Sequence, residues 1–139
     1  MYKFTITIND PEVKKNGMMI RRAGARRWIS PNNKYQAWEK IAVVDLLEWK
    51  HRLPQSFASL LPVSDYTYIY ITPFFKDKRH PDLLNIGQGP QDAMEKAGIF
   101  TNDKLMVPRF NMPVFSKEIG KKLEIEFDLE MEWSNGQGV

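Results

Sequence analysis

The sequence predicts a small α+β protein: a single domain built from a mixed or antiparallel sheet and two main helices. Three observations lead to this fold class. Alternating polar and apolar residues occur near both ends of the chain, a long helical pattern lies between them, and the length of 139 residues is that of one typical domain. We expect residues 1–133 to form the domain and residues 134–139 to be a frayed tail.

The composition excludes several classes of protein. With 42% hydrophobic and 27% charged residues, the chain resembles an ordinary globular protein rather than a disordered one. It has no cysteine, which excludes disulfides, thiolate zinc sites and a cysteine nucleophile. No apolar run is long enough to span a bilayer, and the first residues do not form a signal peptide. We therefore expect a cytoplasmic protein without membrane contact.

Charge is distributed unevenly along the chain. Residues 1–116 carry 17 Lys and Arg against 11 Asp and Glu, a net charge of +6, whereas residues 117–139 carry 3 against 6, a net charge of −3. A basic body suggests a partner that carries phosphates, such as DNA. Many soluble proteins have a similar excess, so the charge alone leaves the partner open.

The first predicted elements are a strand and a basic loop. Residues 2–8 alternate with period two, and Asp10-Pro11 ends this strand. Residues 12–29 contain two glycines and predict a mobile loop or a loose hairpin. Such a segment suits contact with a phosphate backbone, although a solvated charged loop would look the same. Its basic residues are Lys14, Lys15, Arg21, Arg22, Arg26 and Arg27.

A long helix is predicted next, over residues 33–53. Ser30-Pro31-Asn32-Asn33 is a helix-start signal, and Pro54 ends the helix. The helix carries an apolar stripe at spacings of three and four, which indicates core packing in preference to a base-stacking platform. The stripe consists of Tyr35, Trp38, Ala42, Leu46, Trp49 and Leu53.

A second strand is predicted over residues 65–75, after a connector at 55–64. Tyr66, Tyr68 and Tyr70 share one face of this strand, and we expect them to pack in the core, with a partner subunit as the alternative. The connector at 76–81 is basic and ends the strand. It adds Lys76, Lys78 and Arg79 to the candidate DNA-binding residues.

The rest of the chain predicts a broken helix and two strands. Residues 82–97 have helical spacing at both ends but contain Gly87, Gly89 and Pro90, which disfavour a helix interior and predict a break. Residues 104–115 predict a strand interrupted by prolines at 108 and 113. Residues 123–133 alternate strictly and predict an antiparallel strand. Its acidic side is expected to face solvent, with a metal or partner site as the alternative.

The candidate catalytic and metal-binding residues of this sequence are carboxylates. There are only two histidines, and no P-loop or nucleophile-elbow motif is present. Asp82 opens the broken helix, Asp92 lies ten residues later, and Asp103 precedes a strand. Acids gathered beside basic residues suit Mg²⁺, which would orient a water and offset charge on a phosphate. The alternative is a purely structural role for these residues, in which Asp82 caps a helix and Asp103 forms a turn.

A resemblance adds to this interpretation. Residues 80–85 (HPDLLN), 92–100 (DAMEKAGIF) and 102–103 (ND) resemble the signature of RusA-type Holliday junction resolvases, with the spacing from Asp82 to Asp103 matched without gaps. The likeness extends to the first strand, the basic loop, the long helix and the closing strand, and so covers most of the chain.

The resemblance implies a compact α+β homodimer, with a basic dimer face, that cuts four-way DNA junctions using Mg²⁺, with Mn²⁺ as a possible substitute. Carried over by position, Asp82 and Asp103 are the family's metal-binding acids. Asp92 occupies the family's helix aspartate and Asn85 its asparagine. The implied catalytic residues are thus Asp82, Asp92 and Asp103, and the implied metal ligands are these three with Asn85.

Three positions depart from the family pattern. Leu84 replaces the second aspartate of the D-x-D motif, Gln88 replaces the active-site lysine, and Asn102 replaces the first acid of the D-D pair. These changes remove a ligand and a cation that would offset phosphate charge. Two functions remain open: a metal-dependent, structure-selective endonuclease, or a catalytically silent relative that binds branched DNA or a protein partner.

Overall fold

The computed structural model describes residues 1–13, 18–24, 26–31 and 33–130, with only the backbone described in most of 18–31. Within these residues the chain forms strands, α-helices and one 3₁₀ turn, η1. In chain order these are β1 (Tyr2–Asn9), β2 (Met18–Ala23), β3 (Arg26–Pro31), α1 (Asn33–His51), α2 (Gln55–Ala58), β4 (Thr67–Phe75), α3 (Leu83–Lys96), η1 (Asp103–Leu105), β5 (Met106–Phe110), β6 (Val114–Phe115) and β7 (Lys122–Leu129).

The main sheet has the strand order β1-β7-β4-β5, with the short β6 also paired to β4. β7 is antiparallel to both of its neighbours, whereas β5 and β6 run parallel to β4. The parallel pair β4–β5 is possible because α3 supplies the crossover between them. This confirms the predicted α+β class with a mixed sheet and two main helices.

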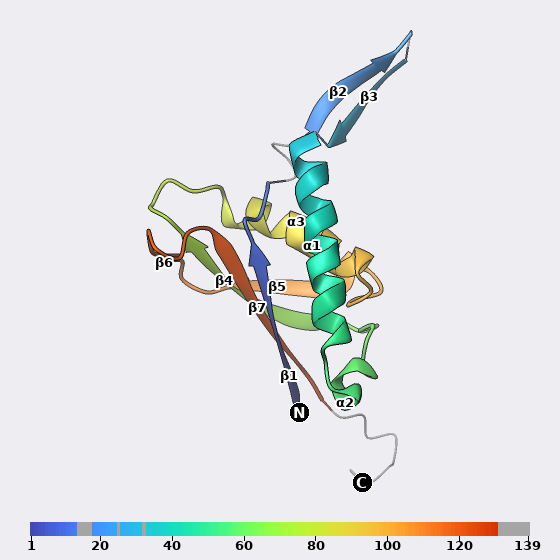
Figure 1. Cartoon of the computed structure of the whole chain (residues 1–139), viewed down its shortest axis with the longest axis vertical. Coiled ribbons are helices and arrows are strands. Elements are labelled where there is room, and N and C mark those ends of the chain that lie inside the picture. The colour runs from blue at the N-terminus through green and yellow to red at the C-terminus, as the bar shows by residue number, and fades with distance from the viewer. Residues whose placement is uncertain (14–17, 25, 32, 131–139) are drawn as a thin grey trace.

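The core lies between one face of the sheet and the two long helices (Figure 1). Side chains in a strand alternate between the two faces, and every second residue of β1, β4 and β7 is buried. α1 contributes the first four residues of its predicted stripe to this core, Tyr35, Trp38, Ala42 and Leu46. The predicted helix, the predicted inward face of the first strand and that of the last strand as far as Phe127 are therefore confirmed. Residues 131–133 of the last predicted strand and the predicted tail at 134–139 lie outside the described residues.

β2 and β3 form a two-stranded antiparallel hairpin in the region predicted as a loop or a loose hairpin. The hairpin projects beyond the N-terminal end of α1 and away from the main sheet (Figure 1). Arg21 and Arg22 lie on β2, and Arg26 and Arg27 on β3, although their side chains are outside the described part. Residues 14–15, which include two predicted DNA-binding lysines, are also outside the described residues.

The predicted break in residues 82–97 is wrong, because α3 is one helix that contains Gly87, Gly89 and Pro90. All three residues are buried. A β-carbon at Gly89 would lie 3.1 Å from Cζ3 of Trp38, and one at Gly87 would lie 3.1 Å from Cζ of Phe110. The two glycines therefore let the helix lie close to its neighbours, and this packing outweighs their low helix propensity.

The predicted core packing of the β4 tyrosines is also wrong. Tyr66, Tyr68 and Tyr70 are 72%, 50% and 44% exposed, whereas Ile69 and Ile71 are fully buried. The two helices cover the isoleucine face of β4, and the tyrosines lie on the open face of the sheet. Period-two alternation separates the two faces of a strand but does not tell which face is covered.

The predicted interruption of the strand at residues 104–115 is wrong for one of its two prolines. Pro108 lies within β5, paired with Ile69 of β4, so it does not interrupt the strand. β5 is an edge strand of the main sheet, and an edge position tolerates a residue without a backbone N–H. Pro113 does separate β5 from β6.

In the described part of the chain, no helix has the length and apolar character that crossing a bilayer requires.

Candidate functional site

A carboxylate pair lies where the last turn of α3 meets η1. Asp92 is on α3 and Asp103 begins η1, and a hydrogen bond joins their two side chains. Glu95 lies one turn after Asp92, and its Oε1 accepts a hydrogen bond of 3.0 Å from the backbone N–H of Asp103. The fold thus brings together two of the three acids predicted from the sequence.

Burial raises the pKa of Asp103 above its usual value, and the negative charge of Glu95 and the hydrogen bond and charge of Asp92 raise it further. A hydrogen bond from the backbone of Lys104 opposes these effects. Protonation of Asp103 is favoured because each negative charge nearby destabilises its ionised form. Glu95 was not predicted; its position three residues after Asp92, on the same side of a helix, was the available signal.

A further acid, Glu39, lies on the neighbouring helix α1. The hydroxyl of Tyr35 donates a hydrogen bond of 3.0 Å to Glu39, and Lys96 forms an ion pair with the same glutamate. The pKa of Tyr35 is raised by burial first, and then by Glu39 and Asp92. The positive charge of Lys96 is therefore already paired with the carboxylate of Glu39.

Asp82 and Asn85 lie at the opposite end of α3. Asp82 occupies the N-cap position, but its side chain makes no capping hydrogen bond. Its carboxylate is exposed, and within the described part of the chain it forms no ion pair. Asn85 is half-buried in the first turn. Leu84, which replaces a family carboxylate, is 67% exposed.

The four predicted metal ligands therefore form two separate pairs. Asp82 and Asp92 are ten residues apart, which corresponds to about 15 Å along a continuous helix. Carboxylate side chains cannot bridge that distance to one ion. Among the described residues, no three His, Asp or Glu side chains are gathered as a metal site. Within one chain, the predicted ligand set does not fit a single Mg²⁺ ion.

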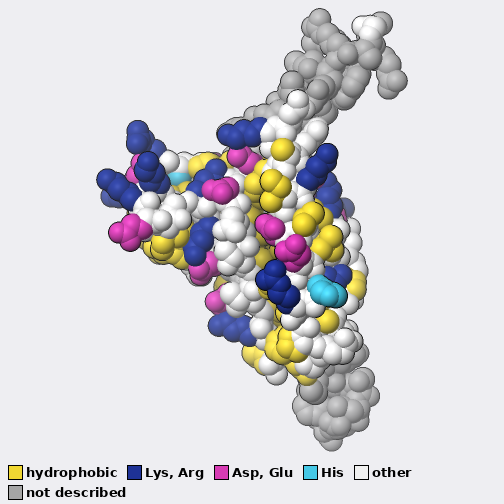
Figure 2. Space-filling view, viewed as in Figure 1, with side chains coloured by type: hydrophobic (Ala, Val, Ile, Leu, Met, Phe, Trp, Pro, Cys, Tyr) yellow, Lys and Arg dark blue, Asp and Glu magenta, His cyan; other side chains and the backbone are white. Residues whose placement is uncertain are grey.

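Basic residues gather on the loop between β4 and α3. Figure 2 shows Lys and Arg side chains over this loop, at the left of the molecule, beside a histidine. Lys76, Lys78 and Arg79 are all exposed. Arg79 forms an ion pair of 3.1 Å with Asp77. The ring of His80 stacks on Phe75 at a centroid distance of 4.3 Å, which anchors the end of the loop to the sheet.

Asn102 has a structural role in place of the family's acid. It caps η1, and its Oδ1 accepts a hydrogen bond of 2.9 Å from the backbone N–H of Lys104. Gln88, at the family's lysine position, is exposed on α3.

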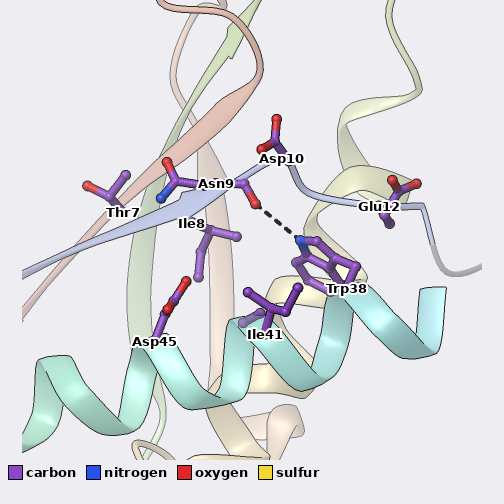
Figure 3. Close-up of a pocket in the computed structure, with 9 residues that line it drawn as sticks. Thr7, Ile8, Asn9, Asp10, Glu12, Trp38, Ile41 and Asp45 are labelled. Atoms are coloured by element: carbon purple, nitrogen blue, oxygen red, sulfur yellow. Dashed lines mark hydrogen bonds between the residues drawn. The ribbon is translucent and has the colours of Figure 1, made fainter. Parts of the chain in front are cut away.

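A separate hollow of about 220 Å³ lies between β1 and α1. Ile8, Trp38 and Ile41 form its apolar part, and the indole N–H of Trp38 donates a hydrogen bond of 3.1 Å to the backbone carbonyl of Asn9 (Figure 3). In Figure 3 the carboxylates of Asp10 and Glu12 point away from α1. None of the residues predicted to be functional lines this hollow.

Comparison with protein-family models and with curated proteins found no match to this chain.

Proposed function

We propose that this protein binds branched DNA, such as a four-way junction, in the manner of a catalytically silent RusA-type protein. The observation that carries the proposal is the exposed basic loop, in which Lys76, Lys78 and Arg79 project together from the body. The hairpin adds four arginines at a second projecting position. Lysine and arginine contacts to phosphates supply most of the affinity of such binding.

The resemblance to RusA-type resolvases supports a junction as the particular substrate. On the same basis, we propose that the protein forms a homodimer and is located in the cytoplasm. Two copies would present two basic loops and two hairpins, and a four-way junction offers several duplex arms to them.

Binding without cleavage agrees best with the arrangement of the acids. Asp82 is separated from Asp92 by most of α3, and the position that would supply a carboxylate next to it is Leu84, an exposed apolar side chain. A phosphodiester at the N-terminal end of α3 would therefore meet Asp82 without Asp92 from the same chain.

A metal-dependent endonuclease is the second candidate, and one observation favours it. The side chains of Asp92 and Asp103 lie together, and Mg²⁺ is commonly held through one or two carboxylates with phosphate oxygens completing the coordination. Such a site would be at the C-terminal end of α3 and would not include Asp82.

One experiment separates these two functions. A synthetic four-way junction and a linear duplex of the same sequence are incubated with the protein in Mg²⁺ or Mn²⁺, and each reaction is run on denaturing and native gels. We expect a shifted junction band with intact strands. Cleavage that Asp103→Asn abolishes would establish the nuclease instead, and cleavage lost in Asp82→Asn would contradict the separation of the two acid pairs.

Charge reversal tests the binding surface. A variant with Lys76→Glu and Lys78→Glu, and another with Arg21→Glu and Arg22→Glu, are each expected to weaken junction binding at least tenfold and to reduce its salt dependence. Lys40→Glu, on an exposed position of α1, is the matched control. Equal binding by all three variants, or no binding by the unaltered protein at low salt, would overturn the proposal.

A further inference from the structure

The open face of the sheet has a pocket of about 440 Å³ at the beginning of β4 and the end of β7. We call it the tyrosine–acid pocket, because tyrosines and carboxylates supply most of its side chains. Its lining residues are Asp65, Tyr66, Thr67, Tyr68, Tyr70, Asp128, Leu129 and Glu130.

The tyrosine rings of this pocket are available to a ligand. Tyr66, Tyr68 and Tyr70 are 72%, 50% and 44% exposed, and the rings of Tyr68 and Tyr70 are 6.5 Å apart, tilted by 39°. The guanidinium of Arg109 already lies 4.8 Å from the centroid of Tyr68. Arg109 therefore already uses the Tyr68 ring for a cation–π contact, and a cationic ligand would meet chiefly the rings of Tyr66 and Tyr70.

The charged side chains that line the pocket are all acidic, although Arg109 lies beside it on the ring of Tyr68. Asp65, Asp128 and Glu130 line it, and no Lys, Arg or His does. Within the described part of the chain, none of these three carboxylates forms an ion pair. Lys3, which lies opposite Asp128 in the β1–β7 ladder, forms its ion pair with Glu126, at 3.3 Å. The pocket is therefore acidic in a chain whose formal net charge is +3.

We propose that the tyrosine–acid pocket binds a lysine or arginine side chain from a basic segment of a protein partner. Tyrosine rings and carboxylates together attract a cationic side chain, because each contributes negative electrostatic potential. The same potential repels phosphates, so this surface and the basic loop bind different partners. The volume accommodates a long side chain together with part of the backbone that carries it.

The test uses the full-length protein and two synthetic peptides. The probe is acetyl-Gly-Ala-Lys-Arg-Ala-Lys-Gly-amide, and the control peptide has glutamine at the lysine and arginine positions. Binding is followed by the NMR chemical shifts of the protein's backbone amides. We expect the basic probe alone to shift residues 65–70 and 128–130, with weaker binding at higher salt.

Matched variants assign the binding to the pocket. Tyr66→Leu and Asp128→Asn are each expected to weaken probe binding about threefold to tenfold, since each removes one source of attraction. Tyr66→Phe, which keeps the ring, and Asp45→Asn, on α1, are expected to bind within twofold of the unaltered protein. All three positions are exposed on the surface, so thermal unfolding should confirm that the four variants fold.

Three results with the peptides would overturn the proposal. These are the absence of shifts at millimolar probe, equal shifts from the glutamine peptide, and binding that neither Tyr66→Leu nor Asp128→Asn weakens. Self-association that the same variants abolish would assign the pocket to a second copy of this chain, and so would also overturn it. Because DNA binding is measured separately, failure here leaves the DNA-binding proposal standing.

Discussion

Gly89 of α3 lies directly against the indole ring of Trp38 of α1, so that a β-carbon at position 89 would be 3.1 Å from Cζ3 of the ring. The same β-carbon would lie 3.0 Å from the backbone carbonyl oxygen of Glu12. Backbone atoms move less readily than the end of a flexible side chain. The closeness of the two helices therefore depends on the absence of a side chain at this position.

Replacing this glycine should destabilise the fold even though alanine favours helices. We expect Gly89→Ala to lower the free energy of unfolding by about 1–2 kcal/mol, because overpacking of a tight contact exceeds the gain of about 1 kcal/mol in helix propensity. Urea unfolding measures the change. Gln88→Ala, at the adjacent exposed position, is the control and should change stability by less than about 0.5 kcal/mol. A stabilised Gly89→Ala protein would show that the two helices lie farther apart.

The hydrogen bond from Trp38 to Asn9 should also contribute to stability. Trp38→Phe removes the indole N–H and leaves the carbonyl of Asn9 without this donor. We expect a loss of about 1–2 kcal/mol in the free energy of unfolding. Trp49→Phe removes a similar bond to Thr5, but that bond is exposed and its loss should cost less. Thermal or urea unfolding of both variants gives the comparison, and equal losses would contradict the role of burial.

The raised pKa of Asp103 predicts how stability depends on pH. A carboxyl whose pKa is higher in the folded state stabilises the fold while it is protonated, and this contribution is lost as the pH rises through the folded pKa. Asp103→Asn should therefore raise the free energy of unfolding at pH 7 by roughly 0.5 kcal/mol. The two proteins should converge in stability as the pH falls towards the usual aspartate range. Urea unfolding between pH 4 and pH 7 measures both effects, and a variant less stable at pH 7 would refute them.

Asp77 should limit DNA binding by the basic loop. Its carboxylate holds Arg79 through an ion pair and hydrogen bonds, and these lower the pKa of Asp77. Asp77→Asn is expected to strengthen junction binding roughly threefold to tenfold and to steepen its salt dependence by about one phosphate contact. Gel-shift titrations at several salt concentrations measure the effect. Asp45→Asn, on α1, should leave the affinity unchanged; an equal gain in both variants would indicate a general effect of charge.

The regular parts of the fold are predictable from side-chain periodicity. Leu123, Ile125 and Phe127 alternate with acids in the sequence and are buried in β7. The spacing of the apolar residues of α1 likewise places Trp38 and Leu46 in the core. Burial of one face dominates the energetics of these elements, so local patterns suffice to identify them.

The failures arise where distant residues decide the local structure. Helix propensity alone disfavours residues 87–90, but contacts with α1 and β5 make small residues necessary there. The exposure of Tyr68 depends on which face of the sheet the helices cover. The predicted set of metal ligands fails for the same reason. Because α3 is continuous, it separates Asp82 from Asp92 and places Glu95 next to Asp103. Spacing along the chain places Glu95 beside Asp92 on a helix, but it does not reveal that the helix is continuous or that Asp103 packs against its end.

The pairing of β1 with β7 affects how the protein reaches its native state. Tyr2 lies opposite Leu129, and Asn9 opposite Lys122, so this ladder joins segments more than a hundred residues apart. Contacts of such long range make folding slow, because the entropy of closing a large loop is lost before the contacts form. During synthesis on the ribosome, Phe4, Ile6 and Ile8 of β1 emerge well before β7 and lack this neighbouring strand until the residues of β7 have been translated. Nascent chains would thus expose an unpaired apolar strand, and efficient production should depend on chaperones that shield it.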